Sequence, residues 1–250
     1  MICYEYPLSE RVRTLLRLED MFDKVRYFAA QEDSQQHHAA LLALFEILEV
    51  ASRADLKSDL LQELERQRQG LELLRSNPAI SEQRLNQVLA EIARCMANIH
   101  GIPGKLGQHL RDNEWLMAIK QRTNIPGGAC EFDLPAYHYW LHLPVVRRQD
   151  EIGEWLTPML PIYDGLSVVL KLLRESGKPT HHIAFAGAYQ QMLAGKSAQM
   201  LRINLRRELP CAPEISANKY ALNIRFMSLG KGRPRLCESD IEFELTFCNL

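Results

Sequence analysis

Residues 220–227, YALNIRFM, alternate apolar side chains with polar or smaller ones, and this period of two residues decides the fold class of the chain. In an extended strand, Tyr220, Leu222, Ile224 and Phe226 fall on one side and the intervening side chains on the other. Residues 201–206, LRINLR, and 241–247, IEFELTF, repeat the same pattern. We therefore predict that the chain after Gly177 forms half-buried antiparallel strands.

Before Gly177, the apolar residues recur at helical spacing and follow capping residues. Ser9, Asp55 and Ser81 are predicted N-caps, because their side-chain oxygens can accept a hydrogen bond from a free N–H of the first turn. The helix that begins at Ser81 has an apolar stripe made of Leu85, Val88, Leu89, Ile92 and Met96. Further helices are expected at residues 39–50, about 105–122 and 147–176. Short loops between such helices predict an antiparallel bundle.

Residues 125–144, IPGGACEFDLPAYHYWLHLP, interrupt the helical pattern. Pro126 and the Gly127-Gly128 pair disfavour helical backbone, so the preceding helix should end by about Asn124. The aromatic residues that follow suit a pleated surface, and we expect residues 132–143 to add strands to the same sheet.

These patterns predict an α+β fold that combines a helical bundle domain with a small antiparallel β-domain. The helical domain is expected to comprise residues 9–124 and 147–177, with Pro158 and Pro161 kinking or splitting its last helix. The β-strand domain is expected to comprise residues 1–8, 125–146 and 178–250, with residues 2–6 forming a strand.

The composition is that of a soluble globular protein, with 46% hydrophobic and 24% charged residues in 250. The first residues lack the basic and apolar regions of a leader, and the longest apolar run, residues 39–45, is too short to cross a bilayer. We expect a cytoplasmic protein with no membrane contact. The six cysteines are scattered and never spaced as C-x-x-C, which favours reduced thiols over disulfides or a zinc ribbon.

The net charge of −1 conceals a basic segment near the C-terminus. Residues 178–236 contain ten Lys and Arg residues but only two Glu residues, and four acidic residues follow at 238–244. A basic segment within an acidic chain predicts an acidic partner. The same charge also fits a nucleic-acid-binding protein, although its cations alternate along strands and no RNP-type aromatic pair accompanies them. A third interpretation is that Arg202, Arg206 and Arg225 pair with Glu242 and Glu244 on one exposed face.

Signals for catalysis are weak. His138 and His142, with Asp133 and Cys130 nearby, form a loose metal-ligand set that completes no zinc signature. No phosphate-binding loop, dinucleotide fingerprint or nucleophile elbow is present. Residues 101–105, GIPGK, are too short for a phosphate-binding loop and contain proline, so a helix–helix loop explains them better. We expect neither enzymatic activity nor a cofactor.

Residues 125–144, together with 224–227 (IRFM) and 9–17 (SERVRTLLR), closely resemble the ZapD family of Z-ring-associated bacterial cell-division proteins. The resemblance covers nearly the whole chain. It implies a protein with a helical domain and a β-strand domain that forms a symmetric homodimer at the mid-cell division site. Such proteins bind the C-terminal tail of FtsZ, the tubulin-like GTPase of the division ring, and cross-link its filaments. That tail is a short segment with acidic, apolar and proline residues.

The residues that match the family's motifs and suit an acidic tail are basic. Helical spacing places Arg13 and Arg17 on one face, and strand spacing places Lys219 and Arg225 on one side. The full set of partner-binding candidates is Arg13, Arg17, Arg122, His138, Arg202, Lys219 and Arg225.

Overall fold

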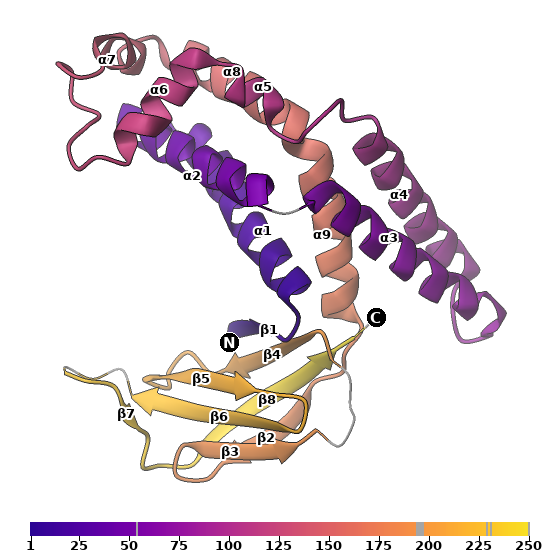
Figure 1. Ribbon diagram of the computed structural model, residues 1–250. Coiled ribbons are helices and arrows are strands. Elements are labelled where there is room, and N and C mark those ends of the chain that lie inside the picture. The colour runs from indigo at the N-terminus through magenta and orange to yellow at the C-terminus, as the bar shows by residue number, and fades with distance from the viewer. Residues whose placement is uncertain (54, 194–197, 229, 231, 250) are drawn as a thin grey trace. The chain divides into compact units, whose positions relative to one another are not determined.

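The computed structural model describes residues 1–53, 55–193, 198–228, 230 and 232–249 (Figure 1). The chain divides into two compact units. The β unit consists of Met1–Arg13 and Leu170–Leu250, and the helical unit consists of Thr14–Val169. An α+β fold is therefore confirmed, with strands of the β unit drawn from both ends of the sequence.

Nine α-helices are found in the described residues, and two of them, α1 and α9, have one end in the β unit. The helices are α1 (Glu10–Ala29), α2 (Ser34–Arg53), α3 (Leu56–Glu72), α4 (Glu82–His100), α5 (Gln108–Arg111), α6 (Glu114–Thr123), α7 (Pro135–Leu141), α8 (Val145–Leu156) and α9 (Leu160–Glu175). Short 3₁₀ turns occupy Leu73–Ser76 and Thr157–Met159.

All three predicted N-caps are confirmed. The side-chain oxygen of Ser9 accepts a hydrogen bond from the backbone N–H of Val12 at 3.2 Å. Asp55 and Ser81 accept equivalent bonds from Ser58 and Arg84, each at 3.4 Å. These contacts satisfy N–H groups that have no acceptor within the helix.

The helical unit is built around buried leucine and isoleucine side chains. Helix α3 packs against α4, and α2 contacts α6, α7 and α8. Leu60 of α3 and Ile99 of α4 are fully buried. Gly165 of α9 lies so close to both that a Cβ atom there would be 2.8 Å from Ile99 Cδ1 and 3.1 Å from Leu60 Cδ2. A side chain at this position would therefore separate α9 from the α3–α4 pair.

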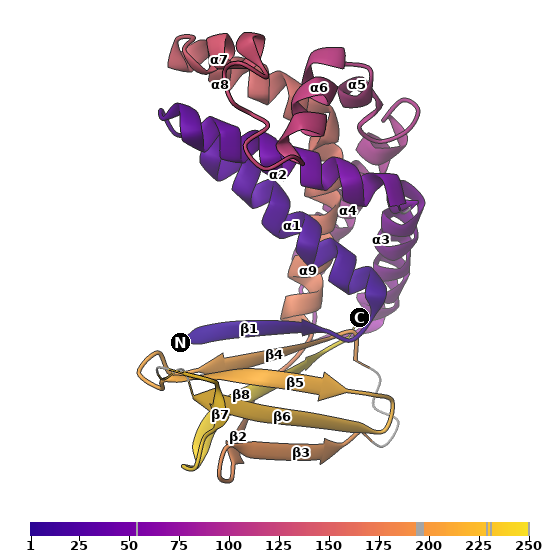
Figure 2. The same cartoon turned by 60° about the vertical axis from the view of Figure 1, so that its left-hand side comes forward.

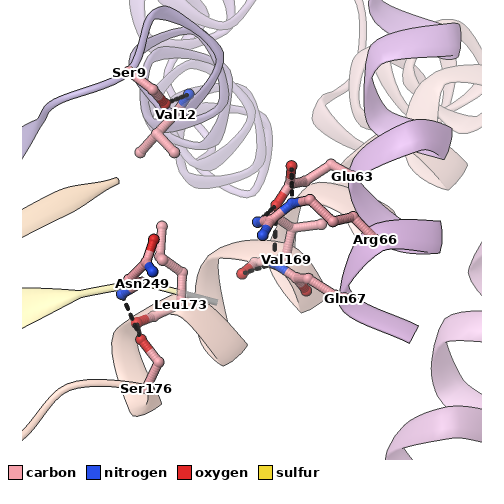
Figure 3. Close-up of polar contacts among 9 residues, drawn as sticks. All are labelled: Ser9, Val12, Glu63, Arg66, Gln67, Val169, Leu173, Ser176 and Asn249. Carbon is pink, nitrogen blue, oxygen red and sulfur yellow. Dashed lines mark hydrogen bonds and ion pairs between the residues drawn. The ribbon is translucent and has the colours of Figure 1, made fainter. Parts of the chain in front are cut away.

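A buried polar group also joins α3 to α9, as Figure 3 shows. Glu63 is only 2% exposed and forms an ion pair with Arg66, with 2.5 Å between Oε1 and Nη2. Gln67 donates from Nε2 to the carbonyl oxygen of Val169 at 3.3 Å. Arg66 compensates the desolvation of the buried carboxylate, and Val169 satisfies the Nε2 group of Gln67, whose buried Oε1 has no partner among the described residues.

The prediction that residues 132–143 contribute strands was wrong, because this segment contains α7. Pro135 occupies the first turn of the helix, where its missing N–H costs no hydrogen bond. Tyr137 and Trp140, three residues apart, then point to one side and are buried, and the Trp140 ring packs against the partly buried rings of Trp115 and Trp155. Residues 125–146 consequently belong to the helical unit rather than to the β unit.

Two other helical segments are divided. The expected helix at about 105–122 is split into α5 and α6, and Asn113 caps the second by accepting from Leu116 N–H at 3.0 Å. The long segment at 147–176 is divided at the 3₁₀ turn that contains Pro158, as predicted. Helix α6 ends at Thr123, which confirms the predicted end of that helix by about Asn124.

One continuous segment, Val145–Glu175, has the length and hydropathy of a membrane-crossing helix. However, 56% of its most apolar window is buried within the protein, and the 3₁₀ turn Thr157–Met159 interrupts it. This burial is the pattern of a core helix.

The β unit contains two antiparallel sheets. One has the strand order β1-β4-β8-β2 and the other the order β3-β6-β5, with β7 also paired to β6. Figure 2 shows β5, β6 and β3 side by side. The strands are β1 (Ile2–Pro7), β2 (Thr180–Ala184), β3 (Ala188–Met192), β4 (Met200–Leu205), β5 (Cys211–Ala217), β6 (Ala221–Ser228), β7 (Arg235–Leu236) and β8 (Ile241–Cys248).

A single apolar core lies between these sheets. Leu222, Ile224 and Phe226 of β6 are fully buried, and the Phe226 ring packs against Phe243 of β8 with centroids 5.0 Å apart. The predicted alternation is thus confirmed from residue 221 onward. Tyr220 is an exception and is 61% exposed.

The exposure of Tyr220 follows from a turn before β6. The Asn218 side chain accepts hydrogen bonds from the backbone N–H groups of Tyr220 at 2.8 Å and Ala221 at 2.9 Å. The strand therefore begins at Ala221, and Lys219 lies in the turn rather than on the strand, contrary to the sequence prediction.

One carboxylate joins three elements of the β unit. Glu5 of β1 accepts two hydrogen bonds from the Arg174 guanidinium of α9, at 2.8 and 2.7 Å. Arg202 of β4 lies 3.2 Å away from the same carboxylate. The Glu5 side chain is only 19% exposed, so these contacts are poorly screened by water.

A second contact in this unit fixes the end of β8. Ser176 donates to the carbonyl oxygen of Leu173 at 2.7 Å and accepts from the backbone N–H of Asn249 at 3.0 Å (Figure 3). The chain just after α9 is thereby held to the end of the last strand.

We predict that Glu5→Gln lowers the free energy of unfolding by about 3 kcal/mol, because it leaves two partly buried guanidinium groups without their shared carboxylate. Urea denaturation should detect the loss. Glu242→Gln is a matched control, since Glu242 pairs with Arg206 in an exposed contact, with side chains 68% and 67% exposed. That change should cost less than about 0.5 kcal/mol. Equal effects of the two substitutions would contradict the central role of Glu5.

Two histidines of α2, the buried His37 and the partly buried His38, give the helical unit a predicted pH dependence. Burial lowers the pKa of both His37 and His38, and His38 Nδ1 lies 2.7 Å from the Tyr137 hydroxyl. In the unfolded chain each histidine takes up a proton near its ordinary pKa of about 6.5, whereas in the folded protein the lowered pKa means that protonation requires a lower pH. Stability should therefore be complete above about pH 6.5 and fall as the pH drops below that value.

Urea denaturation at pH 7.5, 6.5 and 5.5 would measure this dependence. His38→Gln should reduce the slope of stability against pH, and the same change at the exposed His100 is the control. A slope that His38→Gln leaves unchanged would remove His38 from the explanation.

Candidate partner-binding surface

Arg225 is the predicted site residue that lies most openly on a strand. It occupies β6, and its cross-strand neighbours are Ala188 of β3 and Glu214 of β5. Leu222, Ile224 and Phe226 point into the core, so the side chain of Arg225 points to the outer face of the β3-β6-β5 sheet. Its small neighbour Ala188 leaves the guanidinium accessible from that side.

Apolar residues continue this face next to the cation. Met227 is two residues after Arg225 on the same side of β6, and it pairs with Ala212 of β5 and Leu236 of β7. Leu236 is 40% exposed. The name Arg225 surface is used below for Ala188, Ala212, Glu214, Arg225, Met227 and Leu236.

Arg225 makes no ion pair with any residue that the structure describes, even though Glu214 is its cross-strand neighbour. It lies in a unit that carries 14 Lys and Arg residues against nine Asp and Glu residues. Two of these cations, Lys196 and Lys231, lie outside the described residues. The helical unit has the opposite excess, with 22 acidic residues against 16 basic ones. The β unit is therefore the one whose charge favours an acidic partner.

Arg202 has a structural contact instead. It lies on β4 in the other sheet and faces Glu5, as described above. Arg206 pairs with Glu242 at 3.0 Å, so part of the predicted pairing of exposed arginines with the C-terminal glutamates is found. Glu244 instead lies near His181 and accepts from Asn204. Arg225 takes no part in this pairing.

The remaining candidates of the β unit are engaged to different degrees. Lys219 lies over the ring of Tyr220, with its Nζ 4.7 Å from the ring centroid. Arg13 forms an ion pair with Glu10 at 3.1 Å, one turn earlier on α1. Both contacts are local and exposed, and exposed pairs stabilise by about 0 to 1 kcal/mol, so an anionic partner can displace them.

Three candidates belong to the helical unit. Arg17 is exposed on α1 and makes no ion pair among the described residues. Arg122 lies 3.5 Å from Asp133, and the His138 ring lies 3.9 Å from Glu131. The last two candidates therefore face acidic residues of the segment between α6 and α7, which disfavours a second anion there.

The sequence interpretation missed the apolar part of the Arg225 surface. Leu236 belongs to a two-residue strand within a turn-rich stretch, where no alternation is long enough to detect. The pairing of Leu236 with Met227 is visible only in the sheet register. The structure therefore adds one observation, namely that an exposed leucine lies near an arginine without an ion pair.

The structure gives little support to a metal site or to a nucleic-acid-binding face. Among the described residues, no group of three or more His, Cys, Asp or Glu side chains is arranged to hold a metal ion. His138 and His142 stack on the short helix α7 with ring centroids 4.5 Å apart, not on a strand as predicted. The outward positions of β3, β5 and β6 carry no aromatic side chain, so this face offers no stacking platform for nucleic-acid bases.

Sequence comparison supplies the family. The family described as "ZapD: Cell division protein" matches residues 16–225. "Cell division protein ZapD" of Azoarcus sp. (strain BH72) is 57% identical over 251 residues, which cover 100% of both chains. The protein of the same name from Nitrosomonas europaea is 56% identical over 252 residues, covering 100% of this chain and 96% of the relative. That from Dechloromonas aromatica is 55% identical over 252 residues and covers 100% of both.

Proposed function

Because the chain belongs to the ZapD family of cell-division proteins, we propose that it is a non-enzymatic adaptor that binds the C-terminal tail of FtsZ. As a homodimer it cross-links FtsZ filaments and promotes assembly of the Z-ring at mid-cell. The observation that carries this proposal is the Arg225 surface, where an exposed cation without an ion pair adjoins exposed apolar side chains.

The chemistry of this surface matches a segment with acidic and apolar residues. The guanidinium of Arg225 can donate two parallel hydrogen bonds to one carboxylate of the tail, which fixes its position. Met227 and Leu236 offer apolar area for an aliphatic anchor, the kind of contact that supplies most of the affinity in short-peptide recognition. The positive excess of the β unit would attract the tail before contact.

Dimerisation turns tail binding into cross-linking. Two identical sites per dimer can each take a tail from a different filament, and the second contact forms at a high effective concentration. Weak single contacts then suffice to hold filaments together without any catalytic step. Arg13, Arg17, Lys219, Arg122 and His138 stay in this proposal as individual partner-binding candidates, and Arg202 is the weakest candidate because of its contact with Glu5.

We predict that Arg225→Glu weakens binding of a labelled FtsZ tail peptide at least tenfold, because a charge-assisted hydrogen bond is replaced by repulsion. Fluorescence anisotropy at low and moderate salt, with a scrambled peptide as control, would measure the change. Lys178→Glu makes the same reversal at another exposed cation of the basic segment and should alter affinity less than about threefold. Equal losses in both variants would indicate that only net charge matters.

A substitution that should strengthen tail binding tests the same surface. Glu214→Gln removes the acidic neighbour of Arg225, so tail binding should become severalfold tighter. Unchanged affinity in both Arg225→Glu and Glu214→Gln would exclude this surface. Salt-sensitive binding of a DNA duplex without any tail binding would favour the nucleic-acid interpretation instead.

We predict that cross-linking depends on free tails. Filaments of FtsZ mixed with the protein should sediment as bundles at low speed, and an excess of unlabelled tail peptide should return them to single filaments. The scrambled peptide is the control and should leave the bundles intact. Bundles that resist the tail peptide would mean that cross-linking uses another surface.

A further inference from the structure

A cavity in the helical unit is lined by none of the partner-binding candidates named above. Its volume is about 640 Å³, and it lies among the end of α2, the start of α3, the loop before α5 and α5 itself. Among the described residues, three cations line it, Lys57, Lys105 and Arg111, and one carboxylate, Asp55. Asp55 is already engaged as the N-cap of α3. The lining thus has an excess of two positive charges.

None of the three cations has an acidic partner among the described residues. Lys57 donates from Nζ to the carbonyl oxygen of Ile102 at 3.0 Å. Arg111 donates to the carbonyl oxygens of Leu106 at 2.7 Å and Leu48 at 3.4 Å. An ammonium has three N–H donors and a guanidinium has five, so both keep donors for a ligand. Half-buried charges compensated only by carbonyl dipoles are incompletely stabilised, and an anion would complete them.

The start of α3 adds backbone donors to the same cavity. Asp55 binds the N–H groups of Ser58 through its side chain and of Asp59 through its carbonyl oxygen. Leu56 and Lys57 also line the cavity, and their backbone N–H groups find no acceptor among the described residues. Such groups at a helix start attract anions, because the helix dipole adds positive potential there.

The loop that carries Lys105 is held in a defined shape. Gly104 and Gly107 adopt positive φ angles of 63° and 72°. A Cβ atom at Gly107 would lie 2.5 Å from Leu48 Cδ1, so only glycine allows the loop to approach α2 this closely. The contacts of Lys57 and Arg111 with Ile102 and Leu106 fix both ends of the loop. The Lys57 and Arg111 cations and the backbone that carries Lys105 are therefore positioned before any ligand arrives.

We infer that this cavity binds the phosphate group of a small molecule. Three cations and two backbone N–H groups suit the tetrahedral oxygens of a phosphate, and the volume lies in the usual range for small-molecule sites of about 300 to 1,000 Å³. The GIPGK sequence at 101–105 is not a phosphate-binding loop, yet it brings Lys105 to this site. The inference does not rest on FtsZ binding, since all of its residues belong to the helical unit.

Isothermal titration calorimetry with inorganic phosphate, and separately with adenosine monophosphate, tests the site at constant ionic strength set by sodium chloride. Saturable binding at one site per chain is expected for at least one probe. Lys105→Glu should weaken it at least tenfold. The Lys105 side chain is exposed and makes no hydrogen bond or ion pair with a described residue, so this variant should fold normally.

Lys171→Glu provides the matched control, because Lys171 is an exposed lysine on α9 that does not line the cavity. The affinity of this variant for the probe should stay within about twofold of the affinity of the unmodified protein. Absence of saturable binding for both probes would overturn the inference, and so would equal weakening by the two substitutions. Loss of phosphate binding in Lys105→Glu with intact binding of the FtsZ tail would show that the two sites are separate.

Discussion

The β unit depends on one partly buried carboxylate. Glu5 holds Arg174 of α9 and lies against Arg202 of β4, so it ties the first strand of the chain to elements more than 160 residues later in the sequence. Each of these three charges is partly buried, so without a partner its desolvation would destabilise the fold. Their mutual compensation helps to hold β1 beside β4, as the edge strand of its sheet. The unit is consequently assembled from both ends of the sequence.

The two sheets of the β unit differ in how far their outer faces are covered. On the outer face of the β1-β4-β8-β2 sheet, Thr246 and Cys248 are buried, and a Cβ at Gly177 would lie 2.5 Å from Thr246 Cγ2. The end of α9 thus covers part of that face. The inner faces of both sheets are filled by the core, and the outer face of β3-β6-β5 carries the exposed Arg225. Arg225 lies there because it alternates with three buried neighbours on β6.

Local patterns predicted most of the elements, but long-range contacts did not follow from them. Strand β6 and the caps at Ser9 and Ser81 were recognised because period and capping chemistry are local. Aromatic residues at 132–143 misled the prediction, since they fill a buried helix face as well as a sheet, and Pro135 was the overlooked signal of a helix start. Strand β5 was missed because it is an edge strand with Pro213 and only one fully buried residue. The role of Arg202 was missed because its partner lies at the other end of the sequence.

The charge content of the sequence identified the basic segment, but the contacts of each cation within the protein decide which of them can bind a partner. Arg206 has a carboxylate partner and Lys219 rests on an aromatic ring, whereas Arg225 faces solvent beside Met227 and Leu236. The excess charge of the whole unit acts over a distance of about one Debye length and so governs mainly how fast an acidic partner arrives. In the proposed function, contacts at the Arg225 surface govern mainly the dissociation rate of the partner, because they form only after desolvation. Added salt should consequently slow association more than it speeds dissociation, and this separation distinguishes a built recognition surface from a diffuse basic patch.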